Sequence, residues 1–317
     1  RYVVPVANGT DALEIALKSL NLPKNSEVIV PVNTWVSTAE AVVTSNLKVV
    51  FCDINFEDYT ISLEDLNKKI TKKTSCIIPV HLYGNPANMN EIKKIAKKNK
   101  IKIIEDCAQA HGSKIKNKHV GTFGDIGTFS FFPAKNIGGF GDGGCIITNK
   151  KKIYDFCKRF ANHGALKKYD HKFSGRNSRL DVFNAVVIIE KIKTYKRVLE
   201  KRNKIAGYYN HELGSNKEIN LYKTKKDNIY SYHQYVIRIK QRHRDTLIKF
   251  LKKSNINTMI HYPYMLNELS FFNCKKKFIN ADKLGKKILS LPISEEHSKK
   301  EIYYVINKIK NFYKKNK

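Results

Sequence analysis

Short apolar segments alternate with amphipathic segments along the first half of this 317-residue chain, and this alternation limits how the chain can fold. The apolar segments are rich in Val and Ile, as buried strands are, whereas the amphipathic segments have helical periodicity. Predicted strands are Glu27–Val32, Lys48–Ile54, Ser75–Val80 and Lys102–Asp106, and predicted helices begin near Trp35, after Ser62 and at Asn88. This order predicts an α/β fold with a mostly parallel central sheet sandwiched by helices.

The second half of the chain predicts a different organisation, in which a long helix is followed by shorter, mixed elements. The long helix runs from about Asp181 to about Tyr209. Predicted strands follow at Tyr230–Ile239 and Asn257–His261, with predicted helices at Arg244–Lys253, Ala281–Leu289 and Lys299–Lys314. We therefore predict a large domain over residues 1–200 and a smaller C-terminal α+β domain over residues 201–317.

The net charge of +31 suggests a nucleic-acid partner at first sight. Nine of the 59 basic residues are Arg, and the lysines are scattered along helix faces and into the C-terminal tail. Base recognition relies on clusters of Arg, Asn and Gln with aromatic residues, and the sequence shows no such cluster. A solvated cationic surface is the better interpretation, so we predict no nucleic-acid partner.

Other compositional features favour a cytoplasmic protein. No segment reaches the roughly 18 apolar residues of a membrane span, so we expect no membrane partner. The six cysteines form no Cys-x-x-Cys pair and several lie in apolar segments, which predicts buried, reduced thiols. The ten histidines lack metal-ligand spacing, so we predict no metal. The chain begins at Arg1 rather than Met, and we expect a preceding segment to have been removed.

A first candidate binding motif lies at Asn8–Leu13, where a strand leads into a helix. Gly9 allows a ligand to approach the backbone closely. Thr10 and Asp11 open the helix, whose unpaired N–H groups and dipole favour an anion such as a phosphate. On this motif alone, an ordinary helix N-cap is the simpler interpretation.

Further candidates follow predicted strands, where the binding sites of parallel sheets lie. Asp106 ends a strand, and its carboxylate could pair with a protonated ring nitrogen and so make a pyridine ring an electron sink. Gln109 lies three residues further on and could bond a ring oxygen. Trp35, the only Trp, follows another strand and could stack on such a ring. Taken singly, an Asp at a strand end such as Asp106 is more often a cap or turn residue, and Trp35 could equally be a core residue.

Lys135 carries the strongest signal in the sequence. It lies between the aromatic strand Phe129–Phe132 and a loop, Gly138–Gly144, that contains five glycines. Burial beside a ligand lowers the pKa of a lysine and makes its amine nucleophilic, and glycines let the backbone pass close to that ligand. A surface lysine needs no such surroundings, so we predict that Lys135 is catalytic.

With these motifs in place, the chain resembles the DegT–StrS family of nucleotide-sugar aminotransferases, which are fold-type I enzymes that use pyridoxal phosphate (PLP). The resemblance extends nearly from end to end. The matching segments are Asn8–Leu13, Pro31–Ala39, Pro79–Gly84, Glu105–Gly112, Ser130–Gly144, Gly175–Leu180, His261–Pro263 and Leu291–Ser294.

The resemblance implies a role for each matching residue. Lys135 matches the lysine that forms a Schiff base with PLP, and Asp106 matches the partner of the pyridine nitrogen. The other matching cofactor contacts are Gln109 at the ring hydroxyl, Trp35 stacked on the ring, and Gly9, Thr10, Asp11 and Ser130 around the phosphate. Asn177 matches a residue that reaches the phosphate of the neighbouring subunit's cofactor, which implies a homodimer.

The resemblance also implies the reaction. Glutamate would give its amino group to the keto group of a nucleotide-linked keto sugar, leaving 2-oxoglutarate, with ping-pong kinetics. His261 and Tyr262 lie in the segment that approaches the sugar. The loop Pro133–Gly144 is more similar to members that aminate C3, whereas those that aminate C4 more often have a threonine-rich stretch and Glu at the position of Asp142.

Three alternatives stay open. A dehydratase of the same family would typically have His at position 135, and Lys135 argues against it. A non-catalytic regulatory or scaffold protein could keep the fold, but its complete cofactor set would then be unexplained. A cationic nucleic-acid-binding protein rests on charge alone. Family members normally carry a few dozen residues before the strand Tyr2–Ala7, and we expect their absence to affect activity and dimer stability.

Overall fold

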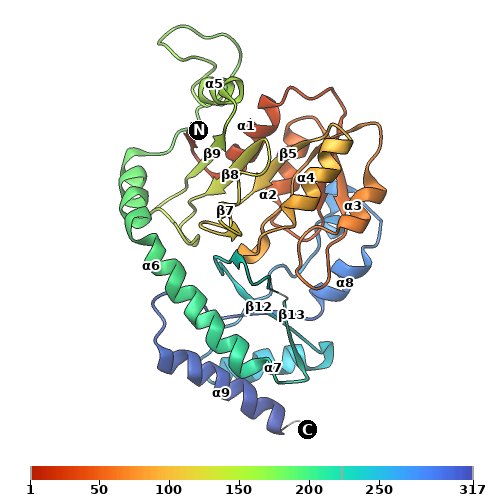
Figure 1. The fold of residues 1–317 in the computed structure, drawn as a ribbon, viewed down its shortest axis with the longest axis vertical. Helices are drawn as coiled ribbons and strands as arrows, with labels where there is room; N and C mark the ends of the chain where they lie inside the picture. Colours follow the sequence, from red (N-terminus) through yellow and green to blue (C-terminus); the bar gives the residue numbers. More distant parts are fainter. Residues whose placement is uncertain (1, 223, 316–317) are drawn as a thin grey trace.

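A large sheet organises the first part of the molecule in the computed structural model, which describes residues 2–222 and 224–315 (Figure 1). The strands lie in the order β1-β9-β8-β5-β4-β2-β3. They are β1 (Tyr2–Val6), β2 (Glu27–Pro31), β3 (Lys48–Cys52), β4 (Thr74–Ile77), β5 (Lys102–Asp106), β8 (Ile126–Ser130) and β9 (Gly144–Thr148). Strand β9 runs antiparallel to β1 and β8, and the remaining neighbours pair in parallel. The predicted mostly parallel sheet is confirmed.

Helices cover both faces of this sheet because successive side chains of its strands point to opposite faces. In β2, Val28 and Val30 join the core that packs against α1 (Gly9–Ser19), α2 (Ser37–Thr44) and α5 (Lys151–Phe160). The intervening Ile29 joins a second core, with α3 (Leu63–Lys69) and α4 (Met89–Lys98). Each fully buried Val or Ile contributes about 1.5–3 kcal/mol. With both faces covered, the strand ends remain for ligands.

The helix α6 (Val182–Leu213) connects the large sheet with the C-terminal part of the chain, and Figure 1 shows it running diagonally between them. Asp181 caps it by accepting a hydrogen bond from the N–H of Phe183, at 2.9 Å. The predicted domain boundary near residue 200 falls inside this helix and stays a prediction.

The C-terminal part is a small antiparallel sheet with helices packed on it, as predicted for an α+β unit. Its strand order is β10-β12-β13, with β10 (Ile219–Leu221), β12 (Tyr235–Ile239) and β13 (Ile288–Leu291). The helices here are α7 (Gln241–Lys253), α8 (Ile279–Gly285) and α9 (Lys299–Lys315), with short 3-10 turns at Leu266–Glu268 and Ser270–Phe272. A ribbon of β11 (Asn228–Ile229), β6 (Lys114–Ile115) and β7 (Lys118–His119) joins the two parts of the chain.

Three expectations for the second half were wrong in detail. The helix predicted over Ala281–Leu289 ends at Gly285, because Ile288–Leu291 is buried in pairing with β12. The strand predicted over Asn257–His261 is reduced to one bridge, between Met259 and Ser290. The predicted strand Tyr230–Ile239 begins only at Tyr235, because the backbone of residues 230–234 forms hydrogen bonds with the large domain instead.

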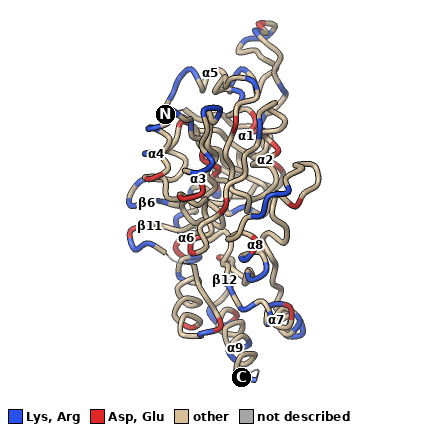
Figure 2. Tube along the Cα trace, turned by 90° about the vertical axis from the view of Figure 1, so that its right-hand side faces the viewer, with Lys and Arg blue, Asp and Glu red and all other residues tan. Residues whose placement is uncertain are grey.

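Basic residues are distributed over the whole molecule (Figure 2). Figure 2 shows Lys and Arg along the whole trace, from the sheet to the C-terminal helices. Within residues 2–222 and 224–315, no helix combines the length and apolarity needed to cross a membrane.

Candidate active site

Three predicted site residues come together at the carboxyl edge of the sheet. Asp106 ends β5, Ser130 ends β8 and Trp35 follows β2. The Asp106 carboxylate is buried and fixed in place, with Oδ2 accepting from Thr38 Oγ1 at 2.9 Å and Oδ1 accepting from the N–H of Ala108 at 3.1 Å. Thr38 lay inside a motif that the sequence had indicated, yet its link to Asp106 spans 68 positions and had no sequence signal.

Lys135 lies at the same edge, on a tightly folded loop. Burial lowers the pKa of its amine, and the negative charge of Asp106 opposes that effect. The backbone folds back on itself through bonds from Lys135 N to Phe132 O and from Gly139 N to Phe131 O, both at 2.8 Å. At Gly138, a Cβ would come within 2.3 Å of the Pro133 carbonyl oxygen, so only glycine fits. The structure thus holds a lysine of lowered pKa near a carboxylate.

Three histidines lie near enough to Lys135 to be affected by its charge, and only one of them, His261, was predicted to have a role. Burial first, and then the charge of Lys135, lower the pKa values of His111, His233 and His261, that of His111 to about 3. All three are therefore neutral at physiological pH. The His111 ring contacts the rings of Phe129 and Phe131, with centroids 5.5 and 5.8 Å away.

The start of α1 and Ser130 form a narrow cradle. A Cβ at Gly9 would meet Ser130 Cβ at 2.8 Å, so glycine is required for this approach. The backbone N–H groups of Gly9 and Thr10 have no acceptor among the described residues. Asn8 caps the helix by accepting from the N–H of Asp11 at 2.7 Å. The free helix amides suit a phosphate.

Asp11 is bonded to other residues of the chain. Its N–H is occupied by Asn8, and its carboxylate forms an ion pair with Arg176, at 2.6 Å. Its N–H and its carboxylate therefore both have partners within the chain, and its place in the phosphate cradle stays a prediction. The ion pair joins it to a partner 165 positions away, which no local pattern reveals.

The opposite side of the site joins the two parts of the chain. Gln109 accepts from the N–H of Tyr83 at 2.6 Å and donates from Nε2 to the Tyr262 hydroxyl at 2.9 Å. The Tyr262 ring lies 5.9 Å from that of Trp35, which is 56% exposed. His261 Nδ1 bonds Ser290 Oγ at 2.9 Å. The exposure of Trp35 rules out a core role and leaves its ring available to a ligand.

Asn177 lies on a segment whose neighbouring residues bond Asp11 and Ala7, at the start of α1. It is exposed, and its backbone pairs with Asn162. The next residue, Ser178, accepts a hydrogen bond from the N–H of Ala7 at 3.1 Å, so the segment is anchored beside β1. Within residues 2–222 and 224–315, the Asn177 side chain forms no hydrogen bond with Lys135 or Asp106.

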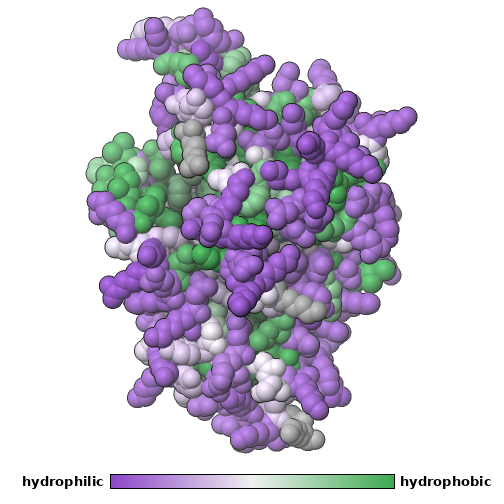
Figure 3. Space-filling view, viewed as in Figure 1, coloured by the Kyte–Doolittle hydropathy of each residue, from purple (hydrophilic) through white to green (hydrophobic). Residues whose placement is uncertain are grey.

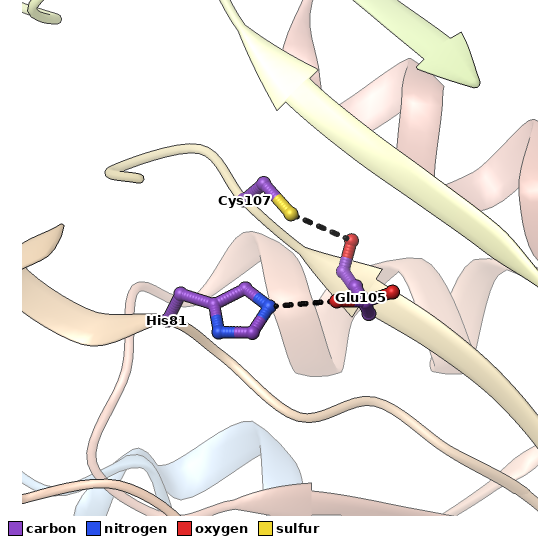
Figure 4. A group of neighbouring side chains, drawn as sticks. All are labelled: His81, Glu105 and Cys107. Carbon is purple, nitrogen blue, oxygen red and sulfur yellow. Dashed lines mark hydrogen bonds and ion pairs between the residues drawn. The ribbon is translucent and has the colours of Figure 1, made fainter. Parts of the chain in front are cut away.

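A separate cluster of three buried side chains lies outside the proposed binding site. His81, Glu105 and Cys107 lie close enough together to suggest a metal site (Figure 4). However, His81 Nδ1 accepts from the N–H of Ala87 at 3.0 Å, so Nε2 carries the proton and donates to Glu105 at 3.1 Å. The same carboxylate accepts from three backbone N–H groups, those of Gly121, Phe123 and Gly124. These bonds occupy the ligand atoms, and the group is a structural support.

The residues at the sheet edge fit PLP. The cradle with free helix amides suits its phosphate, and the Asp106 carboxylate suits its ring nitrogen. Exposed Trp35 suits its ring face, and Lys135 suits its aldehyde, since a lysine of lowered pKa is a good nucleophile. Together, the fold and this site define a PLP-dependent enzyme of the aminotransferase type.

Comparison with known proteins gives the family. Residues 1–310 match the model of the DegT/DnrJ/EryC1/StrS aminotransferase family, and the chain belongs to that family. It is 37% identical to a protein of Geobacillus stearothermophilus named pleiotropic regulatory protein, over 99% of this chain and 86% of the relative. It is 36% identical, over 94% of this chain and 81% of the relative, to the UDP-N-acetyl-3-dehydro-α-D-glucosamine 3-aminotransferase of Acidithiobacillus ferrooxidans.

A solved structure has the same fold. DesV of S. venezuelae, crystallised in complex with a ketimine intermediate, superposes with a TM-score of 0.95 at 30% identity, over 98% of this chain and 85% of DesV. The fold, the PLP dependence and the aminotransferase class predicted from the sequence are confirmed.

Proposed function

We propose that this enzyme transfers the amino group of glutamate to the keto group of a nucleotide-linked keto sugar. The observation that carries the proposal is the placement of Lys135, with its lowered pKa, on a glycine loop facing Asp106. An amine in that position could take the proton from the α-carbon of the amino donor and deliver it to the C4′ carbon of the cofactor within the same half-reaction, and the second half-reaction would run this transfer in reverse. Bound PLP supplies an electron sink for the negative charge that forms at that carbon.

The remaining residues would hold the cofactor and the sugar. Asp106 would keep the ring nitrogen protonated, and Gln109 and Trp35 would hold the ring oxygen and the ring face. The amides of Gly9 and Thr10, with Ser130, would hold the phosphate. His261 and Tyr262 would contact the sugar, since Tyr262 lies between Gln109 and Trp35.

Amination at C3 is the regiochemistry that we favour. Its support is the loop around Asp142 together with the 36% identical relative, whose name specifies a 3-aminotransferase. The test is a two-stage reaction. The enzyme is first treated with glutamate, freed of it, and then given 3-keto or 4-keto nucleotide sugars, with the amino position read by NMR. We expect 2-oxoglutarate in stage one and a 3-amino sugar in stage two; a 4-amino product would refute the C3 assignment, and no 2-oxoglutarate would refute glutamate as donor.

Steady-state kinetics test the order in which the two substrates bind. Because the two substrates use the same site in turn, double-reciprocal plots at several glutamate concentrations are expected to give parallel lines. Intersecting lines would show that both substrates bind together, and that order of events is incompatible with the proposed mechanism.

A regulatory function is the second candidate, because a 37% identical relative carries a regulatory name. A protein that only regulates has no use for a lysine of lowered pKa beside a fixed carboxylate. A reduced-thiol compartment suits both candidates: the six cysteines are free and five are buried, which supports a cytoplasmic location.

A homodimer is also part of the proposal. The first half of α6 exposes an apolar stripe made of Val182, Phe183, Val186, Ile189 and Ile192, visible as the green area at the left of Figure 3. Phe183 is 86% exposed. The stripe follows directly on the segment that carries Asn177. An apolar surface of this kind is typical of a subunit interface, and a second copy would cover it while bringing Asn177 towards the neighbouring site.

Phe183→Asp is expected to dissociate this dimer. A large aromatic side chain at the centre of an interface contributes about 2–4 kcal/mol, so the dissociation constant should rise roughly 30- to 1,000-fold. Sedimentation equilibrium measures the change. Ile279→Asp, at another exposed apolar position on α8, is the matched control and should leave the dimer intact. A Phe183→Asp protein that stays dimeric would show that the stripe is not the interface.

A further inference from the structure

Arg176 links the phosphate cradle to the segment that carries Asn177. Its guanidinium donates from one nitrogen to Asp11 at 2.6 Å and from the other to Glu14 at 2.9 Å. Both carboxylates belong to the opening turns of α1 and are buried, whereas the Arg176 side chain is 39% exposed. Ser178 anchors the same segment to Ala7, just before the cradle. The segment thus clamps the turn into α1 at two points.

The position of the two carboxylates creates an electrostatic problem for the cradle. The start of α1 attracts anions through its free N–H groups and its dipole, which is the basis of a phosphate site. Buried carboxylates one and two turns into the same helix act against that attraction, because like charges repel more strongly where water is excluded. Lys18 is 3.7 Å from Glu14 and relieves only part of this charge. Arg176 is the cation that contacts both carboxylates.

We propose that Arg176 is a positioning residue that makes the start of α1 receptive to the phosphate of PLP by neutralising Asp11 and Glu14. This inference rests on the proposed phosphate cradle at Gly9, Thr10 and Ser130. It gives Asp11 an indirect role at the phosphate. The Arg176 guanidinium bonds Asp11 and Glu14 and, among the described residues, none of those proposed to hold the cofactor ring or the sugar, so its effect should be confined to the phosphate end.

The test compares PLP with pyridoxal, which lacks the phosphate. Dissociation constants for both are measured by absorbance titration of the wild type, Arg176→Gln and Arg176→Lys. Arg176→Gln should weaken PLP binding about tenfold, the effect of about 1.4 kcal/mol, while changing pyridoxal binding less than about twofold. Arg176→Lys keeps the charge and should lie between the two. Arg242→Gln, an exposed position on α7, removes the same charge far from the cradle and should change neither constant.

Rescue separates electrostatics from folding. Adding Asp11→Asn and Glu14→Gln to Arg176→Gln removes the unpaired negative charge and should restore PLP binding to within about twofold of the wild type. Equal weakening for PLP and pyridoxal, or no rescue, would overturn the proposal. If Arg176→Gln does not fold, Asp11→Asn/Glu14→Gln with Arg176 in place gives the sign: tighter PLP binding supports the proposal, and weaker binding refutes it. A wild type that binds no PLP at all would instead refute the proposed function.

Discussion

Lys135→Ala is expected to reduce transamination by a factor on the order of 10⁴ while leaving the fold unchanged. The reason is that the lysine amine is both the nucleophile towards the cofactor and the group that moves the proton in each half-reaction. The side chain is half-buried, and its amine forms no hydrogen bond or ion pair with any described residue, so its loss removes chemistry and little packing. The measurement is the rate of 2-oxoglutarate formation from glutamate in a single turnover, with circular dichroism as the check on folding.

Two further variants sharpen this test. Lys252→Ala, an exposed position on α7, is the matched control and should keep the wild-type rate. A small primary amine such as methylamine, added to Lys135→Ala, should restore part of the rate, because it can enter the vacated space and carry the proton. A Lys135→Ala enzyme that retains more than a tenth of the wild-type rate would show that another group performs the proton transfer.

This test also decides between the two candidate functions. The regulatory function requires no turnover, so Lys135→Ala should leave a purely regulatory protein unaffected in any binding assay. For an enzyme, the same substitution removes the activity. An enzyme would lose its turnover, whereas a regulatory protein would lose nothing. Substitution of Lys135 therefore distinguishes the two functions better than substitution of any surface residue.

The sequence predicted the large sheet well because local patterns determine it. The strand β2 has apolar side chains on both faces, with Val28 and Val30 on one and Ile29 on the other. This pattern is typical of a strand that is covered by helices on both faces. Asp106 and Lys135 were also predictable, since a parallel sheet brings its strand ends to a single edge wherever they lie in the chain. Local sequence patterns therefore predict the edge of the sheet at which the site lies and the residues that face that edge.

Side-chain direction at the site could not be predicted in the same way. Asp11 was predicted to belong to the phosphate cradle, and its ion pair with Arg176, which lies 165 positions away, had no signal in the sequence. His233 was not singled out, because its place depends on Asn136, whose side-chain oxygen lies 2.9 Å from its Nδ1. Ile288 was assigned to a helix, and pairing with β12 overrode that local preference. These are all contacts between distant segments, which periodicity does not encode.

The largest expected effect on stability is that of Glu105→Ala. Glu105 is fully buried, and its carboxylate accepts from His81 and from three backbone N–H groups of the loop that precedes β8. Its removal leaves three buried donors and one half-buried donor without an acceptor, and losing one partner of such a buried network costs about 3–5 kcal/mol in the free energy of unfolding. Urea denaturation followed by circular dichroism measures this loss. Glu64→Ala, which breaks an exposed pair with Lys68, is the control and should leave the denaturation midpoint nearly unchanged.

The same experiment tests whether the group of His81, Glu105 and Cys107 is a support or a metal site. If it is a support, EDTA should leave the unfolding of the wild type unchanged, because every ligand atom of His81 and Glu105 already has a hydrogen-bond partner. Adding His81→Ala to Glu105→Ala should then cost less than the sum of the two single losses, since both substitutions remove the same bond. Destabilisation of the wild type by EDTA, or a loss below about 1 kcal/mol for Glu105→Ala, would contradict the structural role and point to a metal ion between these side chains.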